Sequence, residues 1–172
     1  MFKENQYSEN PHDVLSPWQS ANYILSHTHD GLELAKKYKL PKELADFIDQ
    51  HHGTTFAAYF YHKAKEENPG ANPDDFRYKG MKPQSKETAI IMLADTVEAA
   101  MRSMSEYTYE EMESFVDKLI KTKINDGQLS DCDITLRDIE KIKMSFMYTL
   151  KGYFHQRIKY PGQDENKENT DK

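Results

Sequence analysis

A chain of 172 residues, 37% of them hydrophobic, with a mean hydropathy of −0.89, suits one domain with a modest core. Its longest strongly apolar stretch, 89–94, is far too short to cross a bilayer, and residues 1–4 begin no signal peptide, so we expect no membrane contact by this chain. The net charge of −6 disfavours DNA or RNA as a partner, and the single cysteine, Cys132, excludes an internal disulfide and a zinc site built from thiolates.

The first third of the chain contains the start and stop signals of several short helices. Ser16-Pro17 predicts a helix start, because Ser can cap a helix and Pro is favoured in the first turn. Residues 30–33 have the spacing of a capping box and predict that a second helix opens there and runs through Tyr38. A third helix is expected from Pro41, with Gly53 as its C-terminal stop.

The rest of the chain continues the helical pattern, and no alternating strand pattern competes with it. A stretch rich in Pro and Gly, 68–83, is expected to be a long loop or lid. We therefore predict an all-α domain over residues 1–160, followed by a disordered polar tail at 161–172. The further helices are expected from Thr55, over 85–104, from the capping box at Thr108 to Asp126, and from the cap Thr135 to Phe154.

The adjacent pair His51-His52 is the strongest indication of function, because imidazole is the commonest metal ligand and such a pair is seldom needed for packing. Helix neighbours point about 100° apart, so both rings can reach one ion only near a frayed helix end, which Gly53 supplies. His27 falls near the end of a predicted helix, and Asp95 lies on an apolar helix stripe where a carboxylate needs a partner. These four residues are the candidate metal ligands.

The alternative is that each of these residues has a structural role. A single buried His is more often a hydrogen-bonded core residue than a ligand, and this applies to His27 in particular. Arg102, two turns beyond Asp95, is the candidate substrate-binding residue, although a solvated charge explains it equally well. A set of three His and one Asp suits a divalent transition metal such as iron, manganese or zinc, whereas magnesium and calcium prefer more oxygen ligands.

Several segments resemble the HD-domain phosphohydrolase superfamily, and further segments resemble the cytosolic domain of its seven-transmembrane, PgpH-type group of cyclic di-AMP phosphodiesterases. The resemblance implies an HD-domain helical bundle with a two-metal centre, commonly iron or manganese, that hydrolyses cyclic di-AMP to pApA. It also implies a membrane-anchored parent protein with this domain at the cytoplasmic face. The superfamily segments are 26–31, 51–55 and 94–100, and the group segments are 2–6, 10–13, 76–80, 82–84, 126–128 and 153–158.

Carried over by this resemblance, His27, His51 and His52 match the histidines on one metal, and Asp95 matches the late aspartate on the other. The family's upstream His and its His-Asp pair do not occur before Phe2, so the domain is expected to be N-terminally truncated, to hold at most one ion and to be inactive by itself. Apolar surface left uncovered would favour a homo-oligomer. The alternatives are a non-catalytic helical module for nucleotide sensing or assembly, and an HD nucleotidase for mononucleotides.

Overall fold

The computed structural model describes residues 12, 14–103 and 108–154, with only the backbone of residues 153 and 154. The predicted tail at 161–172 lies outside this range. Helices are the only regular elements among the described residues, apart from an isolated bridge between Phe56 and Arg77, and the all-α prediction is confirmed. None of these helices is long and apolar enough to cross a membrane. The elements are α1 (Pro17–Lys37), α2 (Lys42–Gln50), α3 (Ala58–Glu67), the 3-10 helix η2 (Pro73–Phe76), α4 (Lys86–Arg102), α5 (Tyr109–Asn125) and α6 (Leu136–Phe154).

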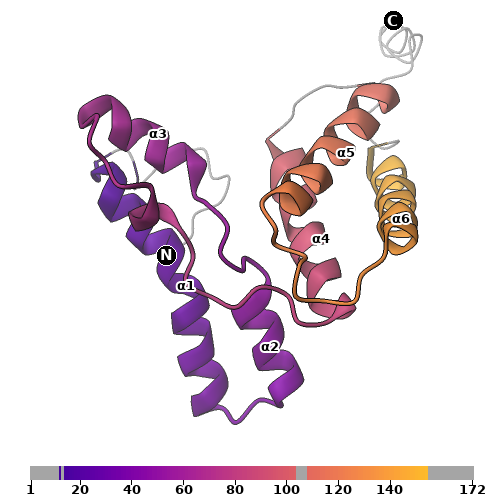
Figure 1. Ribbon diagram of the computed structural model, residues 1–172, viewed down its shortest axis with the longest axis horizontal. Helices are drawn as coiled ribbons and strands as arrows, with labels where there is room; N and C mark the ends of the chain where they lie inside the picture. The colour runs from indigo at the N-terminus through magenta and orange to yellow at the C-terminus, as the bar shows by residue number, and fades with distance from the viewer. Residues whose placement is uncertain (1–11, 13, 104–107, 155–172) are drawn as a thin grey trace, which may run out of the picture.

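The helices form two groups, α1 to α3 with η2 in one and α4 to α6 in the other, as Figure 1 shows. In the first group, Phe76 of η2 is fully buried against Ala21 of α1 and Ala64 of α3. The second group has the larger core, in which α4 packs against α5 and α5 against α6. The two groups meet where α2 packs against α4.

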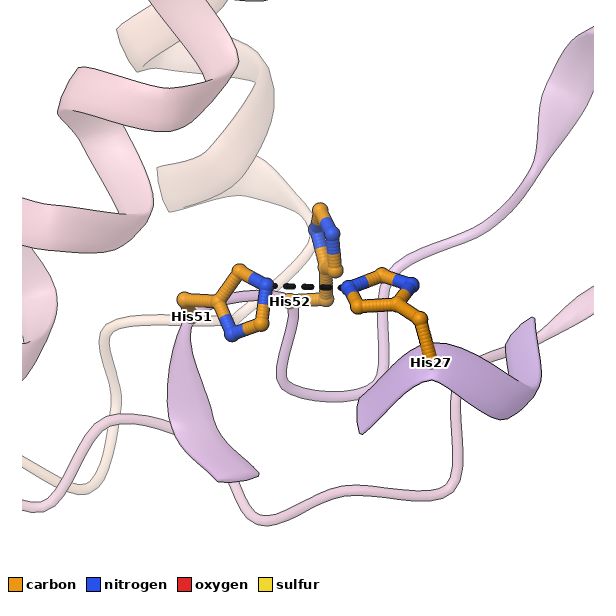
Figure 2. Close-up of side chains that lie close together, drawn as sticks. All are labelled: His27, His51 and His52. Atoms are coloured by element: carbon orange, nitrogen blue, oxygen red, sulfur yellow. Dashed lines mark hydrogen bonds between the residues drawn. The ribbon is translucent and has the colours of Figure 1, made fainter. Parts of the chain in front are cut away.

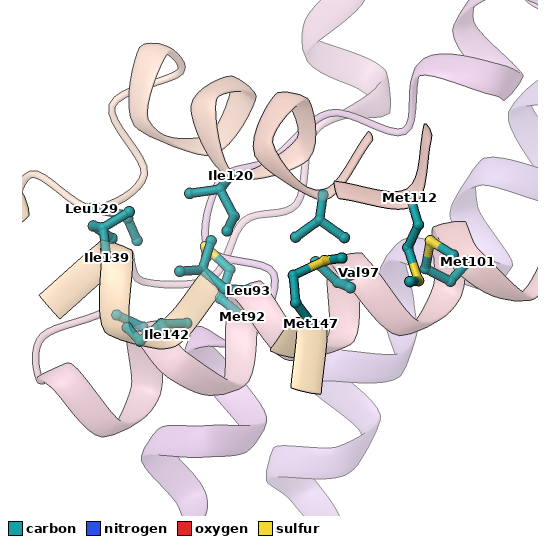
Figure 3. Packing of buried hydrophobic residues seen from close by; sticks show 12 residues of the cluster. Met92, Leu93, Val97, Met101, Met112, Ile120, Leu129, Ile139, Ile142 and Met147 are labelled. Atoms are coloured by element: carbon teal, nitrogen blue, oxygen red, sulfur yellow. The ribbon is translucent and has the colours of Figure 1, made fainter. Parts of the chain in front are cut away.

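The core of the second group is an apolar layer contributed by three helices and by Leu129 of the loop after α5 (Figure 3). One stripe of α4 supplies most of its fully buried side chains, as the helical spacing of its apolar residues requires. Burying one large apolar side chain contributes about 1.5–3 kcal/mol to the free energy of unfolding. This core fixes the axis of α4 and therefore the position of Asp95. The α4 residues are Ala89, Met92, Leu93, Val97 and Met101.

The predicted start of a second helix at residues 30–33 is wrong, because α1 continues without interruption from Pro17 to Lys37. The potential cap Asp30 accepts a hydrogen bond from the Ser26 hydroxyl within the helix instead. Gly31 serves close packing: a Cβ atom built there would lie 2.7 Å from Cγ2 of Ile48 on α2. Tertiary packing of α1 against α2 thus decides the conformation over the local capping pattern.

The remaining boundaries follow the sequence with one exception. Ser85, Thr108 and Thr135 accept hydrogen bonds from the backbone three residues ahead, so the predicted starts of α4, α5 and α6 are confirmed. The expected helix start at Thr55 is wrong, since α3 begins at Ala58. The carbonyl of Thr55 accepts from the Tyr78 amide, which joins this segment to the long loop instead.

Gln128, in the loop after α5, joins the two helix groups. It is 1% exposed, and its Oε1 accepts from the Thr54 amide at 3.0 Å while its Nε2 donates to the Thr54 hydroxyl and to Asp126. Thr54 lies two residues after His52, so these bonds hold the turn that carries the two histidines.

Replacing Gln128 by Met should lower the free energy of unfolding by about 1–3 kcal/mol, because similar volume is kept while the Thr54 amide loses its acceptor. Urea denaturation measures this loss. The exposed Gln84, replaced by Met in the same way, serves as the matched control and should change little. Equal stability of the two variants would contradict this role for Gln128.

Candidate metal centre

Three histidines from two separate segments converge between the helix groups. His27 lies in the middle of α1, and His51 and His52 follow α2 directly. Figure 2 shows the rings of His27 and His51 facing each other, with Nε2 to Nε2 at 3.0 Å. One ring nitrogen of each histidine can be chosen so that all three lie within 4.8 Å of one another. The prediction that a frayed helix end brings the adjacent pair together agrees with Gly53, which ends the turn at φ +54°.

Backbone carbonyls fix the tautomers of two of these rings. Nδ1 of His27 lies 2.6 Å from the Ile24 carbonyl oxygen, and Nδ1 of His51 lies 2.9 Å from that of Ile48. A carbonyl only accepts, so each Nδ1 carries the proton and each Nε2 is left with a lone pair. Two lone pairs facing each other at 3.0 Å repel unless a proton or a metal ion lies between them.

This arrangement fits a metal ion. Two imidazole nitrogens bound at about 2.1 Å and at right angles to one ion are themselves about 3.0 Å apart. Carbonyl acceptors on the far ring nitrogens are the outer contacts that usually orient metal-binding imidazoles. His27, His51 and His52 could therefore hold a divalent ion.

His52 is held in the neutral form that a metal ligand requires. Burial lowers its pKa to about 3, and the neighbouring His51 and His27 act in the same direction. Tyr78 stacks on its ring, with centroids 4.2 Å apart and planes at 22°. Burial also raises the pKa of Tyr78, so this ring stays a neutral phenol. The stacked pair limits rotation of the His52 imidazole.

Asp95 reaches the cluster from α4. Its Oδ2 lies 3.7 Å from Nδ1 of His52, and burial raises the pKa of its carboxyl. The side chain is still 43% exposed, so the apolar stripe overstates how deeply it lies. Asp95 thus lies beside His52 of the centre, whereas Arg102 pairs with Glu98.

Arg102 lies away from the cluster, at the C-terminal end of α4. Its guanidinium forms an ion pair with Glu98 one turn earlier, with Nη2 to Oε1 at 2.5 Å. About seven residues at 1.5 Å rise separate it along the helix from Asp95. Substrate binding by Arg102 remains a prediction.

Two neighbours of the centre were missed by the sequence reasoning. Tyr78 belongs to the long loop, and Lys123 lies on α5, where its charge lowers the pKa of both His52 and Asp95. Lys123 comes seven residues after the buried Val116, and residues at this spacing lie on the same face of a helix. This spacing is the signal in the sequence that could have indicated an inward-facing cation on α5. For Tyr78 the loop offers no periodicity that could have indicated its position.

Comparison with known proteins agrees with this geometry. The HD domain family model matches residues 11–100, a range that contains all four candidate ligands. Two curated relatives are both cyclic-di-AMP phosphodiesterases named PgpH. The Bacillus subtilis protein is 51% identical over 93% of this chain, and the Listeria monocytogenes protein is 50% identical over 93%. The chain spans only 23% and 22% of their lengths.

A solved structure extends the comparison to the fold. The crystal structure of the Listeria monocytogenes PgpH HD domain in complex with cyclic-di-AMP has a TM-score of 0.83 and 48% identity to this chain. The match covers 86% of this chain and 69% of that one. The chain therefore belongs to the HD domain family and is homologous to the HD domains of PgpH phosphodiesterases.

Proposed function

We propose that this domain is part of a metal-dependent phosphodiesterase that hydrolyses cyclic di-AMP to the linear dinucleotide pApA. The observation that carries the proposal is the convergence of three imidazoles, two of them with Nε2 atoms 3.0 Å apart, in a chain homologous to a domain solved with cyclic-di-AMP. The longer protein would be membrane-anchored with this domain at the cytoplasmic face.

His27, His51 and His52 are the proposed ligands of one divalent ion, and Asp95 offers a carboxylate beside them. Nitrogen and oxygen donors together suit iron or manganese. Such an ion would supply Lewis-acid polarisation of a phosphoryl oxygen. The chain itself orients the donors, since the Ile24 and Ile48 carbonyls fix two tautomers and burial keeps His52 neutral.

Calorimetric titration with cyclic di-AMP tests the proposal. We expect binding to the manganese-loaded chain, loss of that binding on chelation, and its loss in His51→Ala. His29→Ala is the matched control, because this exposed histidine of α1 pairs with Asp30 outside the centre. Binding that persists without metal would contradict the phosphodiesterase and favour the non-catalytic sensing module.

We also propose that a polypeptide of these 172 residues holds at most one ion and turns over cyclic di-AMP negligibly. The supporting observation is the donor set, because three imidazoles and one carboxylate suit a single ion, whereas two-metal phosphoryl chemistry clamps both the attacking and the leaving oxygen. Chromatographic detection of pApA from the manganese-loaded chain at a rate far above buffer would refute this point.

Self-association is a further part of the proposal. Large apolar side chains on α1, α2 and the turn between them are 43–67% exposed, and such clusters favour contact with another surface. Light scattering across a concentration series should show a dimer or larger species, and a monomer throughout would contradict it. The side chains are Leu34, Tyr38, Leu40 and Leu44.

A further inference from the structure

Lys123 is placed on the inner face of α5. It lies seven residues after Val116 and three after Ile120, and these two core residues are 0% and 2% exposed. Residues at this spacing share one face of a helix, so the stem of Lys123 continues the stripe that packs toward α4. Its side chain is half-buried.

The ammonium of Lys123 interacts electrostatically with the metal centre. Its charge lowers the pKa of Asp95 and of His52. Burial lowers the pKa of Lys123 itself, and the charges of Asp126 and Asp95 offset part of this effect. In the described part of the chain it forms no hydrogen bond or ion pair with any of them. A lysine of this kind is costly to bury and normally extends to water.

The backbone holds Lys123 against the segment that carries the two adjacent histidines. Its carbonyl accepts from the Gln128 amide at 3.0 Å, and the Gln128 side chain binds Thr54, two residues after His52. Through Gln128, these hydrogen bonds hold the Lys123 backbone beside the turn that follows His52. A cation held in this way beside the metal centre is complementary to an anionic ligand.

We infer that Lys123 contacts a phosphate of the nucleotide bound at the metal centre. This inference rests on the proposed function and deepens it, because it names a group that recognises the anionic part of the substrate from a helix that carries none of the ligands. The alternative is a structural role, in which Lys123 only balances the charge of Asp95. Such a role predicts a direct ion pair between the two side chains, and they do not form one.

Binding of cyclic di-AMP to the manganese-loaded chain tests the inference. Lys123→Met should weaken binding by about 10-fold or more, since a hydrogen bond to a charged group is lost, and the remaining affinity should depend less on salt. Manganese content should stay at one equivalent with wild-type affinity. Lys123→Arg should keep most of the binding, and Lys118→Met, which removes an exposed charge from the same helix, should bind as wild type. If the Met variant does not fold by circular dichroism, Lys123→Gln takes its place.

Each outcome decides the inference. Unchanged affinity in Lys123→Met overturns it, and so does a parallel loss of manganese, which would show that Lys123 acts through Asp95. If the wild-type chain binds manganese but no cyclic di-AMP, the proposed function fails, and inorganic phosphate becomes the probe. Weaker phosphate binding by Lys123→Met than by wild type then sustains the inference, and equal or absent binding in both overturns it.

Discussion

Replacing His51 by Ala is expected to weaken divalent-metal binding by about 100-fold or more. The change removes one of the two Nε2 atoms that face each other at 3.0 Å, and loss of an outer contact to a ligand alone costs 10- to 100-fold. At a metal concentration 1,000 times the wild-type Kd, the ion stabilises the wild-type fold by about 4.1 kcal/mol, and a 100-fold weaker variant retains about 1.4 kcal/mol. Urea unfolding with and without manganese measures both values.

The control for this substitution is His29→Ala, because His29 lies on α1 two residues after His27 but outside the cluster. His29 is 77% exposed and lies 3.6 Å from Asp30. Its loss should leave the metal-dependent gain in stability unchanged. A full metal-dependent gain in His51→Ala would show that the converging imidazoles are not a metal site.

The sequence predicts well those features that depend on neighbouring residues. The Ser85 and Thr108 hydroxyls accept hydrogen bonds from amides in the first turn of the helices that they cap. No distant segment is needed to form these caps, so the local pattern predicts them correctly. The pair His51-His52 was interpretable for the same reason, because Gly53 and the helical spacing before it already fix where the helix ends. The fold adds the short distance between this pair and His27.

Features set by distant segments were predicted poorly. Residues 30–33 carry a valid capping pattern, yet Ile48 packs at Gly31 and the helix continues. The apolar stripe of α4 indicated a deeply buried Asp95, but its carboxylate is partly exposed. Tyr78 reaches His52 from a loop, so no periodicity in the sequence could indicate the stacking.

Replacing Gly53 by Ala is expected to lower the free energy of unfolding by about 2–5 kcal/mol. The left-handed backbone at φ +54° costs a residue with a Cβ about 1–2 kcal/mol, and overpacking adds about 1–3 kcal/mol. The added Cβ would lie 2.5 Å from Oε1 of Gln128 and 2.9 Å from Cε of Met92. Met92 can move its terminal methyl, whereas the Gln128 oxygen is held by the Thr54 amide.

Gly152→Ala is the matched control for this change, because a Cβ there meets no atom within 4 Å and α6 should gain about 0.5–1 kcal/mol from the better helix former. Opposite shifts of the urea midpoint are therefore expected for the two Gly→Ala variants. Since Gly53 follows His52 directly, its variant should also bind manganese more weakly, as relief of the clash displaces the turn that presents both rings. A Gly53→Ala protein with wild-type stability and metal affinity would show that the turn after α2 tolerates a side chain and does not constrain the centre.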